Sequence, residues 1–222
     1  MRQLLILARV LALVSALVGC SKQPPHSDTI PVIATDAEHN RYYKEASNLV
    51  MPYLKLVNAS EKPANTPGAQ GELRRGIALY EAVIKYAPRN WSAYWLMGKA
   101  HQALGEHEAA CDALGNAFAI ERRNVDVARE YMLECLDLGR HAEAVSAGEH
   151  AVSVKPRDAG LLANLALAYL MAGRNTEALS KVEESLSIDP SDKITASLKR
   201  VIREIIDGKR PQPKTVNELE SK

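Results

Sequence analysis

The sequence predicts an all-α fold, a superhelix of stacked helical hairpins closed by a C-terminal capping helix. Of the 222 residues, 46% are apolar and only 5% are aromatic, while Ala and Leu are abundant, and this composition favours helices over strands. A pattern of small and apolar residues also recurs every 34 residues through the middle of the chain. Each period contains a glycine at the same place, Gly105, Gly139 and Gly173.

The period defines three windows, Trp91–Asn124, Val125–Asp158 and Ala159–Asp192. Glycine permits the left-handed turn that can end a helix, and Ala or Ser at the crossing points lets two antiparallel helices approach closely. Asn or Asp at the end of a window is suited to cap the first helix of the next. The crossing places contain Ala110 and Ala117, Ala144 and Ala151, and Ala178 and Ser185.

Residues 1–19 predict a secretory signal segment. Arg2 gives a positive start, and a mostly apolar run from Leu4 to Val18 ends in small residues. The run is too short and too interrupted for a typical membrane-spanning helix. An uncleaved anchor helix and an ordinary secretory signal are the alternatives.

The end of this segment, "LVGC" (Leu17–Cys20), resembles the bacterial lipobox. That resemblance implies cleavage after Gly19, a lipid on Cys20 and acylation of the new N-terminus. Two or more acyl chains hold a protein at a membrane, whereas one gives only marginal binding. Ser21, instead of an aspartate, favours the outer membrane facing the periplasm. Residues 20–35 are rich in Pro and polar side chains and predict a flexible tether.

Residues 36–90 predict a degenerate helical hairpin. A Thr35-x-x-Glu38 capping box opens the first helix, Asp36–Val57, and Pro52 is expected to kink it or end it early.

The second helix of this hairpin is predicted over Gly71–Asn90. The loop at 58–70 is longer than a short helical hairpin normally has. It is either a tolerated insertion or a binding insertion.

Two segments follow the last window. Residues 193–207 alternate apolar and charged side chains at helical spacing and predict the capping helix that a solenoid needs over its last apolar face. Residues 208–222 begin with Gly and contain two prolines, and they predict a disordered tail.

The three windows resemble tetratricopeptide repeats (TPRs). The matches include Tyr94, Gly98, Leu165, Tyr169, Pro156 and Pro190, in addition to the recurring alanines. Three departures are Met132 at a place usually held by a small residue, Arg122 in place of proline, and Cys135 in place of tyrosine. The resemblance implies stacked hairpins, and a helical bundle without repeat geometry is the alternative.

In the TPR family, fixed places of each first helix line a concave groove that receives a partner's peptide or helix. On this resemblance the predicted groove residues are Trp95, Lys99, Arg129, Leu133 and Asn164. Trp95 is a candidate hot spot, and Lys99 and Arg129 are expected to steer an acidic partner. The alternative for Trp95 is sideways packing on the preceding helix.

The sequence contains no phosphate loop, no H-E-x-x-H and no G-x-S-x-G, so no enzyme activity, cofactor or metal is predicted. The net charge of +1 argues against a nucleic-acid partner. His107 and Cys111 lie one helical turn apart, but two ligands do not make a metal site. Cys111 and Cys135 either form a disulfide or remain buried thiols.

The predicted function is a membrane-anchored adaptor that binds another envelope protein and assists assembly of a complex such as a pilus or a secretin. Among lipidated TPR families the chain looks like the pilotins and pilus-assembly lipoproteins. The alternative is a scaffold that recruits peptidoglycan hydrolases or other cell-envelope enzymes. Repeats of this kind specify a fold and not a client.

Overall fold

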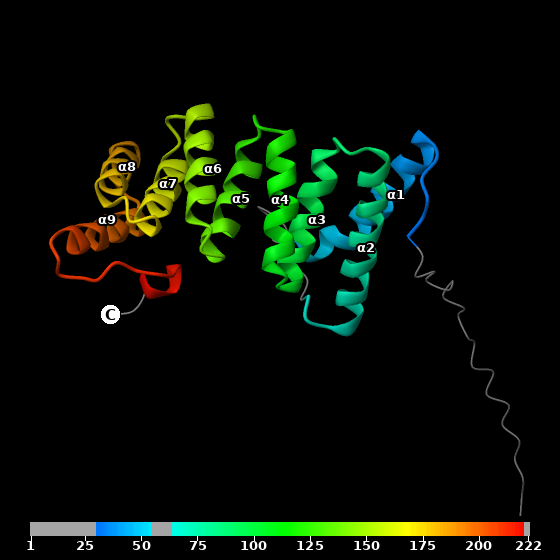
Figure 1. Ribbon diagram of the computed structural model, residues 1–222, viewed down its shortest axis with the longest axis horizontal. Coiled ribbons are helices and arrows are strands. Elements are labelled where there is room, and N and C mark those ends of the chain that lie inside the picture. Colours follow the sequence, from blue (N-terminus) through cyan, green and yellow to red (C-terminus); the bar gives the residue numbers. More distant parts are fainter. Residues whose placement is uncertain (1–29, 55–63, 220–222) are drawn as a thin grey trace, which may run out of the picture.

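The computed structural model describes residues 30–54 and 64–219, and within them the chain is a row of helical hairpins (Figure 1). Consecutive helices pack against each other along the whole row. The helices are α1 (Asp36–Val50), α2 (Pro67–Tyr86), α3 (Trp91–Leu104), α4 (His107–Ile120), α5 (Val125–Asp137), α6 (His141–Val154), α7 (Ala159–Met171), α8 (Asn175–Ile188) and α9 (Lys193–Ile206), with short 3₁₀ turns η1 (Met51–Tyr53) and η2 (Val216–Leu219). The all-α prediction is confirmed for the described residues.

Each window begins with a capped helix. The side chains of Asn90, Asn124, Asp158 and Asp192 accept hydrogen bonds from backbone N–H groups in the first turns of α3, α5, α7 and α9. A cap satisfies N–H groups that have no partner within the helix. The predicted capping role of Asn124, Asp158 and Asp192 is therefore confirmed, and Asn90 caps α3 in the same way.

The turns inside the hairpins depend on glycine. Gly105, Gly139 and Gly173 have φ angles of 72°, 70° and 73°. After each, the next N–H returns to a carbonyl of the preceding helix, as Arg140 N does to Cys135 O at 2.7 Å. Because side chains with a Cβ resist this conformation, the recurrence of glycine follows directly from the turn geometry.

Helices of a hairpin cross where a small residue faces a large one. In the first repeat, a Cβ added to Gly98 on α3 would lie 2.8 Å from Leu114 Cγ on α4. In the second repeat the sizes are exchanged, since a Cβ at Gly148 on α6 would lie 2.8 Å from Met132 Sδ on α5. Met132 is therefore accommodated by a glycine in the partner helix, which explains why this departure from the repeat pattern is tolerated.

The first hairpin differs from its prediction at the end of α1 and at the beginning of α2. α1 has the capping box at Thr35 and Glu38, and it ends at Val50, where η1 with Pro52 follows. α2 begins at Pro67 and not at Gly71, because the Thr66 hydroxyl accepts from Ala69 N and proline is suited to the first helical position. The loop predicted over residues 58–70 is shorter by this turn of helix, and its residues 58–63 lie outside the described chain.

The segment after α9 corrects the prediction of a disordered tail over residues 208–222. In the described part of this tail, Gln212 Nε2 donates to Leu170 O at 2.6 Å, and Asn175 Nδ2 donates to Gln212 Oε1 at 2.9 Å. Val216 and Leu219 pack against the main hydrophobic core. Apolar and amide side chains in this segment thus find partners that only the folded superhelix brings within reach. We call residues 209–219 the C-terminal strap.

None of the helices in the described ranges is long and apolar enough to cross a membrane. The signal segment 1–19, the lipid attachment at Cys20 and most of the tether 20–35 lie outside those ranges.

Candidate functional site

The first helices of successive hairpins form one continuous surface, which we call the inner face. α1 contacts α3, α5 contacts α7, and α7 contacts α9. Among these helices, α3, α5 and α7 carry the predicted groove residues. The groove residues on α3, α5 and α7 differ in exposure and in hydrogen-bond partners.

Lys99 is not an open cation of the inner face. Only 7% of the residue is exposed, and its ammonium group lies 3.1 Å from Glu130 Oε2 on α5. Burial of an ion pair requires that each charge keep its partner. The placement corrects the expectation that Lys99 presents its charge to an acidic partner, because the charge is used to join two repeats.

Beside this ion pair lies a polar cluster that the sequence analysis did not identify. Glu134 on α5 is only 3% exposed. Its Oε2 accepts from Gln102 Nε2 at 2.6 Å, and its Oε1 lies 2.7 Å from His107 Nδ1 on α4. Burial, followed by the charge of Glu134, raises the pKa of Asp137 nearby. The cluster connects α3, α4 and α5 through a buried carboxylate, so His107 is engaged here and does not pair with Cys111 as a metal ligand.

The sequence contained an indication of this cluster, because one residue of the second window departs from the 34-residue pattern. Glu134 occupies a place where the other two windows have Ala100 and Ala168. A charged residue where neighbouring repeats are buried alanines indicates a specific contact. His141 occupies the place equivalent to His107, but Ala168 cannot give it a carboxylate.

Trp95 lies between two hydrophobic cores. It packs against the cluster formed by α1, α2 and α3 and also against the cluster that extends from α4 to α9. Its Nε1 is buried and has no hydrogen-bond partner among the described residues. Trp95 is therefore partly buried between the two cores, and its role as a binding hot spot stays a prediction.

The accessible part of the inner face lies on α5 and α7. The Arg129 side chain is 38% exposed and pairs with Asp126 at 2.9 Å. Leu133, Asn164 and Leu167 are partly buried, with Leu133 and Leu167 packed on the core edge. This stretch offers a guanidinium, an amide and apolar side chains together, which suits a partner segment of mixed chemistry.

The C-terminal strap limits this surface at one end. Leu170 of α7 is fully buried, and its carbonyl oxygen accepts a hydrogen bond from Gln212 Nε2. At the other end the Lys99–Glu130 ion pair and the Glu134 cluster fill the space between α3 and α5. The open stretch is therefore bounded on both sides.

One further cluster of reactive side chains lies away from the inner-face residues. Cys111, Cys135 and Glu143 are the group in the described chain whose potential ligand atoms all lie within 4.8 Å of one another.

Comparison with solved structures finds the same architecture in other repeat proteins. MamA from Desulfovibrio magneticus RS-1 aligns with a TM-score of 0.61 and 12% identity over 84% of this chain and 95% of that one. YrrB, a TPR protein with an unusual peptide-binding site, aligns with a TM-score of 0.57 and 18% identity over 78% and 86%. PilF from Pseudomonas aeruginosa aligns with a TM-score of 0.54 and 17% identity over 78% and 71%. Likenesses at these identities concern the fold alone.

No curated protein matches this chain by sequence. The family model described as tetratricopeptide repeat matches residues 64–126 and 133–193, which is more than half of the chain. The match indicates no catalytic family, and the TPR fold is a scaffold for protein–protein interaction. With its period, caps, glycine turns and stacked hairpins in agreement, the chain belongs to the tetratricopeptide-repeat family.

Proposed function

We propose that this chain is a membrane-anchored adaptor that binds a segment of another envelope protein and assists assembly of a complex such as a pilus or a secretin. The anchor is Cys20, in the lipobox-like "LVGC". The binding surface is the open stretch of the inner face on α5 and α7. The observation on which the proposal rests is that this stretch stays accessible while both of its ends are closed by internal contacts.

The chemistry of the open stretch suggests what it binds. Arg129 is already paired with Asp126, and this exposed ion pair holds its partner only weakly. A partner carboxylate can therefore compete for the guanidinium, while Leu133 and Leu167 offer apolar contact. A peptide or helix with an acidic group beside apolar residues fits this surface.

Similar proteins support this proposal in general terms. YrrB is described as having an unusual peptide-binding site, and PilF is a structural neighbour with a TM-score of 0.54. The peptide-binding site is a property of YrrB. For this chain they support a peptide-binding role, and the pilus or secretin client rests on the lipoprotein resemblance of the sequence.

The first experiment tests the anchor. Cells expressing the full chain and its Cys20→Ser variant are fractionated, and the protein is followed in soluble and membrane fractions. We expect Cys20→Ser to move the protein to the soluble fraction. A variant that still sediments with membranes would contradict lipid anchoring.

The second experiment tests the surface and the client. The tagged full chain is captured from detergent-solubilised membranes, and bound proteins are identified by mass spectrometry. Arg129→Glu is compared with Arg123→Glu, the same charge reversal at an exposed turn residue. We expect pilus or secretin subunits with the parent chain and Arg123→Glu, and a loss of at least about tenfold with Arg129→Glu, which corresponds to about 1.4 kcal/mol.

Two outcomes of the capture would overturn the proposal. Equal capture by Arg129→Glu and Arg123→Glu would exclude the inner face as the binding surface. Specific capture of cell-wall hydrolases in place of pilus or secretin subunits would favour the scaffold alternative.

A further inference from the structure

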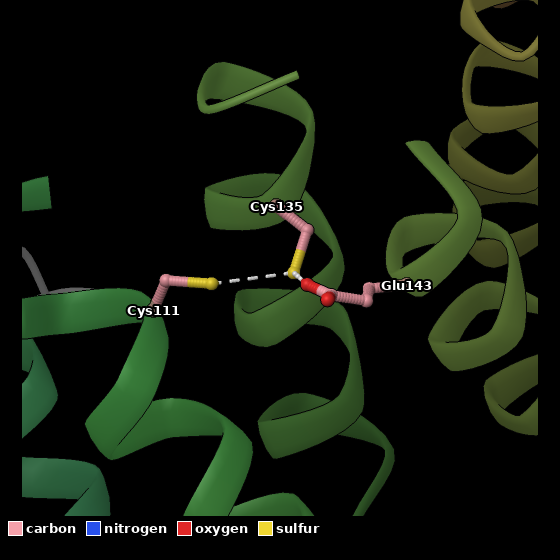
Figure 2. A group of neighbouring side chains, drawn as sticks. All are labelled: Cys111, Cys135 and Glu143. Carbon is pink, nitrogen blue, oxygen red and sulfur yellow. Dashed lines mark hydrogen bonds between the residues drawn. The ribbon is translucent and has the colours of Figure 1, made fainter. Parts of the chain in front are cut away.

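Two buried thiols face each other across the junction between the first and second repeats. Cys111 lies on α4 and Cys135 on α5, and both side chains are fully buried. Their Sγ atoms are 3.4 Å apart, although the residues are 24 positions apart in sequence (Figure 2). This is van der Waals contact between sulfurs, and a disulfide of about 2.05 Å requires them to approach by about 1.4 Å more.

Charged groups flank this pair on opposite sides. Arg140 Nη1 lies 3.4 Å from Cys111 Sγ, and Cys135 Sγ lies 3.7 Å from Glu143 Oε2. Figure 2 shows Glu143 reaching Cys135 on the side away from Cys111. The arrangement places a cation beside one sulfur and a proton acceptor beside the other.

The two sulfurs therefore differ in reactivity. Burial raises the pKa of the Cys111 thiol, while the hydrogen bond from Cys135 and the guanidinium of Arg140 act against that rise. Burial raises the pKa of Cys135 as well, and Cys111 and the carboxylate of Glu143 raise it further. Because the thiolate is the nucleophile and Arg140 Nη1 lies 3.4 Å from Cys111 Sγ, we assign Cys111 as the attacking group of the pair.

A metal site is the less favoured interpretation of the same cluster. Cys111, Cys135 and Glu143 provide three ligand atoms within 4.8 Å, whereas structural zinc sites in proteins use four. Arg140 also places a positive charge 3.4 Å from one of the sulfurs. A cation bound there would be repelled by the guanidinium.

We propose that Cys111 and Cys135 are a redox-reactive pair that closes to a disulfide and so joins α4 to α5. The oxidant is a disulfide, either a small one such as oxidised glutathione or that of a thiol oxidoreductase. The Cys111 thiolate attacks it, forms a mixed disulfide and releases one thiol. Cys135 then transfers its proton to Glu143 and attacks Cys111 Sγ, which releases the second thiol.

The reaction balances without a further reactant. The two cysteines together lose two protons and two electrons, and the oxidant disulfide is reduced to two thiols. Arg140 is a positioning residue that favours the Cys111 thiolate, and Glu143 accepts the proton of the second step.

The bond would act on the shape of the superhelix. α4 is the second helix of one repeat and α5 the first helix of the next, so a bond between them fixes the junction of two neighbouring repeats. In a solenoid, curvature is set by the rotation at each junction. This inference does not depend on the proposed partner.

The experiment uses the purified full chain with Cys20→Ser, which leaves Cys111 and Cys135 as the two thiols. The protein is reduced, oxidised with glutathione disulfide at neutral pH, denatured, alkylated with iodoacetamide and weighed by mass spectrometry without reduction. We expect the loss of two hydrogen atoms, no alkylation, and a linked peptide pair containing both cysteines. Because both thiols are buried, the oxidant reaches them through local opening, so urea below the unfolding transition should speed the oxidation.

The flanking groups provide a readout that a merely close pair of thiols would not. Glu143→Gln should accumulate the mixed glutathione adduct on Cys111, since the second step loses its proton acceptor. Arg140→Gln should slow consumption of the first thiol. Glu108→Gln, an exposed acid on α4, is the matched control and should behave as the parent chain.

Three results would overturn the proposal. Two alkylated cysteines after prolonged oxidation of the folded protein would show that the pair does not close. A glutathione adduct that persists in the parent chain would show that Cys135 cannot complete the step. Stoichiometric zinc binding that protects both thiols and is lost in Glu143→Gln would identify a metal site in place of a redox pair.

Discussion

Gly98 is the position where the structure makes the sharpest stability prediction. On α3 it faces Leu114 of α4, and a Cβ added there would lie 2.8 Å from Leu114 Cγ, 3.1 Å from its Cδ2 and 3.3 Å from Ala110 O. Leu114 is fully buried, and Cγ is the branch point of its side chain and not a mobile end. The Gly98→Ala substitution must therefore displace a packed side chain.

The expected magnitude comes from two opposing terms. Overpacking a buried site costs about 1–3 kcal/mol. Replacing glycine by alanine inside a helix gains about 1 kcal/mol. Gly98→Ala should thus lower the free energy of unfolding by about 1 kcal/mol, with an upper bound of about 2 kcal/mol from the same terms.

The sign should reverse when the obstacle is removed. Leu114→Ala alone costs about 2–5 kcal/mol through the cavity it leaves. In that background the contacts with Leu114 Cγ and Cδ2 are absent and the contact with Ala110 O at 3.3 Å remains, so Gly98→Ala should recover most of the helix-propensity gain of about 1 kcal/mol. The assay is urea denaturation of all four proteins followed by far-UV circular dichroism, with the folded baseline of Leu114→Ala as the check that it still folds.

A matched control is available in the next repeat. A Cβ at Gly148 would meet Met132 Sδ at 2.8 Å, and a thioether can move aside more easily than a leucine branch point. Gly148→Ala should therefore cost less than Gly98→Ala. If Gly98→Ala lowers stability equally with Leu114 and with Ala at position 114, the close helix crossing is not the cause and the reasoning fails.

Three further predictions concern other elements. Glu134→Ala should lower the free energy of unfolding by about 1–3 kcal/mol in urea, because Gln102 loses its buried acceptor; an unchanged midpoint would contradict the polar cluster. Hydrogen bonds from Thr195 lower the pKa of Asp192 below its ordinary value of 3.8. The ionised carboxylate therefore contributes its full share to the free energy of unfolding above pH 3.8, and this contribution is lost as the pH falls through the pKa of Asp192 in the folded protein. In thermal melts from about pH 6 to about pH 2.5, the melting temperature should accordingly fall less in Asp192→Asn than in the parent chain. An equal fall in both proteins would refute this. Leu219→Asp should expose the strap to limited proteolysis after α9, since Leu219 packs on the core; cleavage at the parent rate would show that the strap is held without it.

Parts of the candidate site could be anticipated from the sequence and parts could not. Arg129, Leu133 and Asn164 were predicted as groove residues because the resemblance to tetratricopeptide repeats assigns their places on the first helices to the concave groove. The partners of those side chains were not visible in the same pattern. Lys99 and Glu130 are 31 positions apart, and the contact between them depends on how two repeats stack.

What the sequence by itself determined about this protein is the set of features that depend on neighbours within a helical turn or two. The caps, the left-handed glycine turns and the order of helices are of this kind, because backbone hydrogen bonds and φ angles are local. Only the tertiary structure decided which large side chain meets which glycine, how the strap reaches Leu170 from 42 positions away, and that two distant thiols touch. These depend on the distance and angle between packed helices, which are set by the whole core and not by any single stretch of the chain.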